Sequence, residues 1–203
     1  MPRIPAAERR SDFVKAAVKV IATHGIDGAT TRRIAEQAQA PLATLHYCYH
    51  TKEDLFADVY AFVARRFREV VRENDPHADP ATTARRLLRG LMECYLESDD
   101  FAATALELIS WARRQHEDLG IRVYDEAFEA ARTVLQSTAS SRPLEAETID
   151  EIAYVLATLA DGFALNWLTY GDRSAAVKQM EVTAAVLDSW LAVRLASVPA
   201  ALG

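Results

Sequence analysis

The side chains best suited to binding chemistry lie close together between residues 30 and 55. Thr44, Tyr47 and Lys52 bring two hydroxyl groups and an ammonium group into one short segment. Hydroxyl groups hydrogen-bond phosphate oxygens or base edges, and a threonine methyl packs on the methyl group of thymine. An ammonium at the first turn of a helix binds phosphate together with the backbone N–H groups there. Each residue alone is an ordinary solvated or capping side chain, so their common arrangement decides the interpretation.

Three helices in succession are predicted up to Tyr49, and the third of them carries Thr44 and Tyr47. Apolar residues spaced by three and four predict a helix over Arg9–His24, which Gly25 ends. Thr30 caps a short helix over Thr31–Gln39, and a further short helix covers Leu42–Tyr49. A helix as short as this third one fits the major groove, which is about 12 Å wide.

Residues 30–55 resemble the DNA-binding domain of the TetR family of one-component transcriptional regulators. They read TTRRIAEQAQAPLATLHYCYHTKEDL, against a family pattern of the type T-x-R-x-I-A-x-x-A-G-V-S-x-G-T-L-Y-x-H-F-x-[ST]-K-E-x-L. The resemblance covers about residues 9–60, and Asp161–Trp167 are similar to a stretch of the family's penultimate helix. It implies a nine-helix, all-α protein with a helix-turn-helix DNA-binding domain over residues 1–54. An effector-binding and dimerisation domain is implied over residues 55–203.

The resemblance also implies which residues meet a double-stranded DNA operator. The base-facing positions are Arg32, Leu42, Ala43, Thr44 and His46, and the phosphate-facing positions are Thr31, Tyr47 and Lys52. Because few of these side chains are charged, we expect the amino-terminal arginines to add phosphate contacts. These arginines are Arg3, Arg9 and Arg10.

Departures from the family pattern at Gln39, Pro41 and His46 bear on DNA binding. Gln39 replaces the turn glycine, so that a non-glycine residue has to accept a positive φ or the turn differs. Pro41 stands where the family often has a capping serine, and that cap is lost. His46 replaces the usual tyrosine, and its protonated form would bind phosphate more tightly in acid.

The rest of the chain predicts further helices and an effector pocket among the middle ones. The predicted helices are Thr51–Glu73, Ala81–Ser98, Phe101–His116, Leu119–Ser137, Thr148–Tyr170 and Ala175–Ser197. Candidate pocket residues are large and mostly apolar: Phe62, Phe67, Met92, Tyr95, Trp111, Tyr124, Phe128, Phe163, Asn166, Trp167 and Tyr170. Plain core packing also explains such residues, although Trp111, Tyr95 and Asn166 carry polar groups that an effector would satisfy.

The last two predicted helices are apolar around most of their circumference. Terminal helices of a small domain are not easily buried by their own chain alone. We therefore expect a homodimer in which two helices from each copy form a four-helix bundle. A thick monomeric core is the alternative.

The charge, the cysteine content and the absence of known motifs narrow the classes of function that the chain could have. The net charge is −6, yet eight basic against six acidic residues give residues 1–54 a net +2, which leaves −8 on the other 149. The two cysteines cannot build a disulfide framework and suggest a reducing compartment. We expect a cytoplasmic protein with no signal peptide or membrane span, and no metal or cofactor. The sequence lacks G-x-S-x-G, HExxH, CxxC and a phosphate-binding glycine loop, which argues against an enzyme.

The expected function is therefore that of a repressor released from its operator by a small, largely apolar effector. Two alternatives stay open. Cys48 lies on the predicted recognition helix, where oxidation would block DNA binding and make the chain a thiol-responsive regulator. The departures at Gln39 and Pro41 also allow a dimeric helical scaffold without specific DNA binding.

Overall fold

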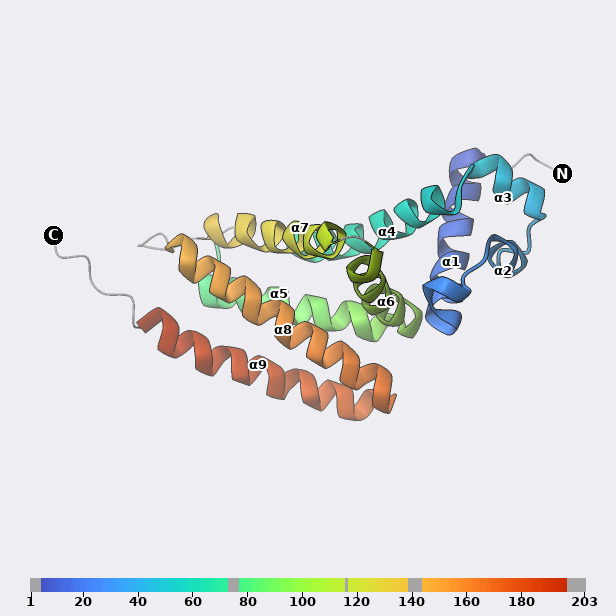
Figure 1. The fold of residues 1–203 in the computed structure, drawn as a ribbon. Coiled ribbons are helices and arrows are strands. Elements are labelled where there is room, and N and C mark those ends of the chain that lie inside the picture. The colour runs from blue at the N-terminus through green and yellow to red at the C-terminus, as the bar shows by residue number, and fades with distance from the viewer. Residues whose placement is uncertain (1–4, 73–76, 116, 139–143, 197–203) are drawn as a thin grey trace. The chain divides into compact units, whose positions relative to one another are not determined.

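The computed structural model describes residues 5–72, 77–115, 117–138 and 144–196, and every regular element in these ranges is a helix (Figure 1). The all-α prediction is confirmed, and apart from α1, which is longer at both ends, the helices begin and end within two residues of the predicted bounds. They are α1 (Ala6–Gly28), α2 (Thr31–Gln37), α3 (Leu42–Cys48), α4 (Lys52–Arg72), α5 (Pro80–Glu97), α6 (Asp99–Gln115), α7 (Glu117–Gln136), α8 (Ala146–Tyr170) and α9 (Arg173–Ala196).

The chain divides into two compact units. The first unit contains Met1–Arg66 and Glu97–Val123, and the second contains Phe67–Leu96 and Tyr124–Gly203. The amino-terminal helices thus share their unit with α6, which lies far along the chain. Helical periodicity predicts which face of α6 is apolar, but it does not predict which helix that face meets.

The first unit is held together by the packing of α6 against α1. Phe13, Ala17 and Ile21 follow one face of α1 and are buried, as their spacing predicts. The fully buried Thr104 of α6 donates a hydrogen bond of 2.8 Å to the carbonyl of Val18. This bond gives the hydroxyl group a partner where water cannot reach it.

Gly25 interrupts α1 without ending it. Its φ of 68° and ψ of 170° lie outside the helical region, and the helix resumes beyond it up to Gly28. The predicted break at this glycine is therefore present as a kink. Beyond the kink, Ile26 and Ala29 are buried and therefore belong to the core of the unit.

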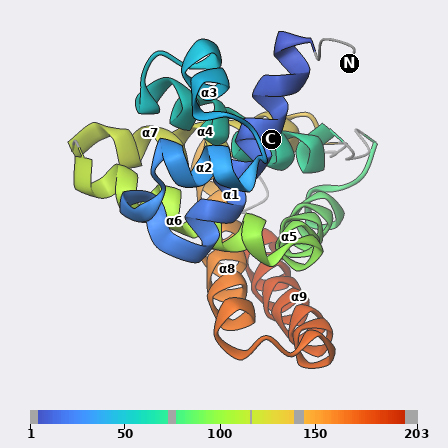
Figure 2. The same cartoon turned by 90° about the vertical axis from the view of Figure 1, so that its right-hand side faces the viewer.

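In the second unit α8 and α9 run side by side, as both views show (Figures 1 and 2). Gly171 ends α8 in the left-handed conformation, with φ 64°, and Asp172 then accepts hydrogen bonds from the first backbone N–H groups of α9. The buried side chains of α9 recur every three or four residues: Ala176, Met180, Ala184, Leu187 and Leu191. Two ion pairs join α5 to α9, Arg85 with Asp188 at 2.8 Å and Arg89 with Glu181 at 2.9 Å.

By length and composition alone, α8 is apolar enough to cross a membrane, with a mean hydropathy of 1.3 over its most apolar window. This is weak evidence, because the core helix of a soluble protein has the same length and composition. Residues such as Ile152, Leu156 and Phe163 are buried inside the second unit, so packing within the protein accounts for a large part of this apolar character.

Candidate nucleic-acid interface

The first half of the helix-turn-helix is a short helix with a side-chain cap. Thr30 has extended backbone angles, and its hydroxyl accepts a hydrogen bond of 3.3 Å from the backbone N–H of Arg33, which confirms the predicted cap. Ile34 and Ala35 are buried, so one face of α2 is fixed against the unit. The Arg33 side chain donates to the carbonyl of Gly28 at 2.8 Å, which ties α2 to the end of α1.

The turn between α2 and α3 ends α2 in a left-handed residue. Gln39 has φ 51°, so the expectation that a non-glycine residue accepts a positive φ at this position is confirmed. The N–H of Gln39 donates to the carbonyl of Glu36, and that of Ala40 to the carbonyl of Ala35, both at 3.0 Å. This pair of bonds is the Schellman motif, whose left-handed residue is usually glycine.

The helix that would read DNA, α3, begins without a side-chain cap. Pro41 occupies the N-cap position with φ −59° and ψ 140°, and no side chain accepts from the first N–H groups, as the lost serine predicts. Leu45 is buried and fixes the inner face of the helix. The outer face presents Tyr47, which is 73% exposed, together with Leu42, which is 39% exposed.

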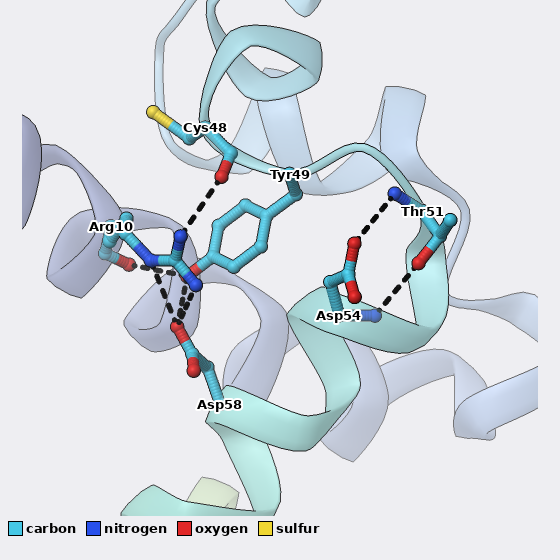
Figure 3. Close-up of polar contacts among 6 residues, drawn as sticks. All are labelled: Arg10, Cys48, Tyr49, Thr51, Asp54 and Asp58. Carbon is cyan, nitrogen blue, oxygen red and sulfur yellow. Dashed lines mark hydrogen bonds and ion pairs between the residues drawn. The ribbon is translucent and has the colours of Figure 1, made fainter.

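The start of α4 is held by a capping box. The hydroxyl of Thr51 accepts from the N–H of Asp54, and the Asp54 carboxylate accepts from the N–H of Thr51, each at 3.1 Å (Figure 3). The Lys52 ammonium lies 4.8 Å from the centre of the Phe56 ring and donates to the carbonyl of Ile26 at 3.3 Å. Two of its three N–H donors are left for a phosphate.

The eight residues predicted to meet DNA differ in exposure. The exposed residues are Arg32, Leu42, Ala43, His46 and Tyr47, and the half-buried ones are Thr31, Thr44 and Lys52. The Arg32 guanidinium forms an exposed ion pair with Glu36 at 3.2 Å, one turn further along α2. Such a pair is worth little in water, and a phosphate or a guanine edge can replace it.

The amino-terminal arginines take part in contacts that the sequence did not predict. Arg9 pairs with Asp12 at 3.6 Å, and Arg3 lies outside the described residues. Arg10 donates to the carboxylate of Asp58 and also lies over the ring of Tyr49. The signal that could have predicted this contact is Tyr49 itself, because a tyrosine on the inner face of a helix needs a partner for its hydroxyl.

The residues predicted to line an effector pocket are distributed over both units. Phe62 and Trp111 belong to the first unit and pack against other rings, Phe62 against Phe101 and Trp111 against Phe56, each at about 6.4 Å between ring centres. The nine other candidates belong to the second unit. The ring pairs of the first group are packed edge to face, which fits a core as well as a pocket.

In the second unit the candidates differ in burial. Met92, Tyr95, Phe163 and Trp167 are buried, Phe67 and Phe128 are half-buried, Asn166 and Tyr170 are exposed, and the side chain of Tyr124 lies outside the described residues. Tyr95 packs against Phe67 at 5.9 Å and donates to Asp161 at 3.4 Å. The Asn166 amide donates to the carbonyl one turn earlier in its own helix. Among these candidates, Trp167 has a buried Nε1–H without a partner in the described part of the chain, a state that it shares with the hydroxyl groups of Thr83 and Thr148.

Metal and thiol chemistry receive little support from the described residues. No group of three or more His, Cys, Asp or Glu side chains in the described ranges has the arrangement of a metal site. Cys48 is half-buried at the end of α3, and Cys94 is buried. Neither cysteine is part of a disulfide bond in this structure.

Known proteins resemble the chain in both sequence and fold. Residues 13–59 match the model of the family described as bacterial regulatory proteins, tetR family. The HTH-type nicotine-responsive transcriptional repressor HdnoR of Paenarthrobacter nicotinovorans is 29% identical over 171 residues, which cover 81% of this chain and 86% of that protein. The HTH-type transcriptional repressor AcnR of Corynebacterium diphtheriae is 27% identical over 173 residues, which cover 81% of this chain and 83% of that protein.

A solved structure extends the likeness to the fold. The TetR-like transcriptional regulator from Rhodococcus sp. RHA1 superposes with a TM-score of 0.71 at 23% identity, covering 94% of this chain and 98% of that one. The sequence matches span the helix-turn-helix and continue through the later helices. Residues 13–59 therefore carry the DNA-binding domain of the tetR family of bacterial regulatory proteins, and the chain as a whole is similar to transcriptional repressors of this kind.

Proposed function

We propose that the chain is a repressor that binds operator DNA through α3 in the cytoplasm. The observation that supports this most directly is the outer face of α3, where Ala43, His46 and Tyr47 are exposed while Leu45 is buried. A small residue near the start of the helix permits close approach to the bases, and the imidazole and phenol groups hydrogen-bond bases or phosphates. Thr44, Lys52, Thr31, Arg32 and Leu42 complete the proposed contact set.

We propose that the active form is a homodimer. Besides their buried stripes, α8 and α9 expose large apolar side chains: Tyr154, Leu165, Tyr170, Val177, Val182, Val186 and Val193. Several exposed apolar side chains on two neighbouring helices are typical of an interaction site, and a second copy of the same helices would remove them from water. Two copies would also supply two α3 helices for half-sites about one turn of DNA apart, roughly 34 to 36 Å.

We propose that the effector is a mainly apolar molecule with a hydrogen-bond acceptor. Support comes from the Trp167 Nε1–H, which is a donor only and has no partner among the described residues. Tyr95 and Phe67 place an edge-to-face aromatic pair in the same unit. The relative from Paenarthrobacter nicotinovorans is named as nicotine-responsive, so nicotine, with a pyridine nitrogen as acceptor, is the first probe.

The DNA proposal is tested by measuring binding of the full chain to two duplexes over a range of salt concentrations. One duplex is selected by the wild-type chain from a randomised pool, and the other is its scrambled sequence. We expect the selected duplex to bind about 10³-fold or more tightly, with a steep salt slope. Tyr47→Ala should weaken this binding, while Val182→Asp should weaken dimerisation, as measured by sedimentation. Equal binding to both duplexes would favour the dimeric helical scaffold instead.

The effector proposal is tested with the same selected duplex. Nicotine is titrated into the protein–DNA complex, and release is compared between the wild-type chain and Trp167→Phe. We expect the wild-type complex to dissociate and the variant to need more nicotine, because the indole donor is gone. Release that is the same in both chains would remove Trp167 from the proposed site. If nicotine does not raise the midpoint of thermal unfolding of either chain, the proposed chemical class of effector is wrong.

A further inference from the structure

Three side chains from separate helices meet where α3 ends (Figure 3). Tyr49 follows the last residue of α3, is 1% exposed, and donates a hydrogen bond of 2.8 Å from its hydroxyl to the carboxylate of Asp58 on α4. The same Asp58 oxygen accepts from Arg10 of α1, at 3.0 Å from Nη2 and 3.2 Å from Nε. The Arg10 guanidinium lies 4.4 Å from the centre of the Tyr49 ring. We call Arg10, Tyr49 and Asp58 the anchor cluster.

The anchor cluster also holds the backbone of α3. Arg10 Nη1 donates to the carbonyl of Cys48 at 3.1 Å, which satisfies one of the carbonyl groups that a helix leaves open at its end. A cation at the carboxyl end of a helix also interacts favourably with the helix dipole. The edge-to-face contact of Tyr49 with Phe13, at 6.5 Å, adds a fixed point on α1. The end of α3 is therefore joined to both α1 and α4.

The two halves of the anchor cluster differ in strength. Arg10 and Asp58 are both partly open to solvent, so their ion pair is screened and weak by itself. The Tyr49 ring is buried, and its hydroxyl bonds a charged acceptor, which makes the Tyr49–Asp58 bond the stronger contact. Burial and the bond to Asp58 raise the pKa of the Tyr49 phenol, so this hydroxyl stays protonated and remains a donor at neutral pH.

The opposite end of α3 has no comparable attachment. Pro41 provides no side-chain cap, and the turn before it contains the left-handed Gln39. With only seven residues, α3 has a single buried residue, Leu45, between these ends. Its direction therefore depends on how its carboxyl end is held. The family pattern has phenylalanine at the position of Tyr49, so the hydroxyl contact is a feature of this chain.

We infer that Arg10, Tyr49 and Asp58 are positioning residues that set the direction in which α3 meets DNA. This rests on the proposed DNA binding. Tyr49 is buried, and Arg10 and Asp58 both contact it, so we expect the members of the cluster to act through α3 and not by touching the bases. Loss of the cluster should then reduce discrimination between DNA sequences, because base contacts need a fixed helix direction. Binding through phosphate contacts tolerates a tilted helix and should persist.

The test compares binding to the selected duplex and to the scrambled duplex for four full-length chains. These are the wild type, Tyr49→Phe, Asp58→Asn and the double variant, all measured well below their unfolding midpoints. We expect specific affinity to fall about threefold in Tyr49→Phe and about tenfold in Asp58→Asn. The double variant should lose less than the product of the two single losses, because both substitutions act on the same hydrogen bond. Affinity for the scrambled duplex and its salt slope should stay at the wild-type values.

Tyr60→Phe is the matched control, since Tyr60 is a tyrosine that lies on α4 and outside the anchor cluster. It should keep the wild-type ratio of specific to scrambled binding. Equal losses on both duplexes, or an unchanged ratio in Asp58→Asn, would overturn the positioning role. Additive losses in the double variant would also contradict it. A wild-type chain that fails to discriminate between the duplexes would instead overturn the proposed DNA binding, on which the inference rests.

Discussion

Replacing Gln39 with glycine should stabilise the protein, although glycine usually destabilises folded chains. Gln39 is exposed and has φ 51°, a conformation that side chains with a Cβ rarely adopt. Its own N–H and that of Ala40 close the Schellman motif at the end of α2. The side chain of residue 39 is therefore strained by its backbone and contributes little packing in return.

The expected gain follows from two opposing effects. A left-handed conformation costs an L-residue about 1–2 kcal/mol. Glycine removes this strain, but it loses more conformational entropy on folding, about 0.5–1 kcal/mol. The difference predicts that Gln39→Gly raises the free energy of unfolding by about 0.5–1 kcal/mol, which corresponds to a rise of about 1–4 °C in the unfolding midpoint for a chain of this size.

The assay is thermal and urea unfolding at a fixed protein concentration, because association also shifts the midpoint. Ala40→Gly is the matched control, since the neighbouring residue takes a negative φ and gains nothing from glycine. It should lower the free energy of unfolding by about 0.5–1 kcal/mol. If both substitutions lower stability, the left-handed turn is not the conformation of this chain in solution.

Further predictions concern two separate buried hydroxyl groups and two helix caps. Thr104→Val should lower the free energy of unfolding by about 1–3 kcal/mol, because it breaks the buried hydrogen bond to α1. Thr83→Val should be neutral or stabilising, because the buried Thr83 hydroxyl has no partner among the described residues; the reverse order in urea unfolding would contradict both. Thr30→Ala should cost about 1 kcal/mol and Thr30→Ser far less, measured by the same method. Hydrogen bonds from the side chain and backbone of Thr82 lower the pKa of the Asp79 carboxyl below its ordinary value of 3.8. Asp79→Ala should therefore cost about 1 kcal/mol at pH 7, and its difference from the wild type should vanish as the pH falls through that lowered pKa; a constant difference in acid would refute this cap.

Local signals in the sequence were sufficient to predict the helices and their ends. Thr30 caps α2, Gly25 kinks α1, and the Thr51–Asp54 capping box starts α4, each through contacts within a few residues. The replacement of glycine by Gln39 left two alternatives, a positive φ or a different turn, and the structure has the positive φ. These features could be predicted because propensity and capping act over single turns of helix.

The contacts between distant segments could not be predicted in the same way. No periodicity in α6 indicates that Thr104 bonds to α1, and nothing near Arg10 in the sequence points to Asp58. The same limit applies to the effector residues, since Asn166 and Tyr170 were chosen for their chemistry and lie exposed. Helical spacing places a residue on a face, but the partner of that face is decided by the packing of the whole unit.

The most direct test of the account is hydroxyl-radical footprinting of the wild-type chain on the selected duplex. A dimer that inserts one α3 into each half-site predicts two protected segments on one face of the DNA, about one helical turn apart. Tyr47→Ala should weaken both segments together. Protection that is uniform along the duplex, or a single protected segment, would contradict the proposal that this chain reads DNA as a symmetric dimer.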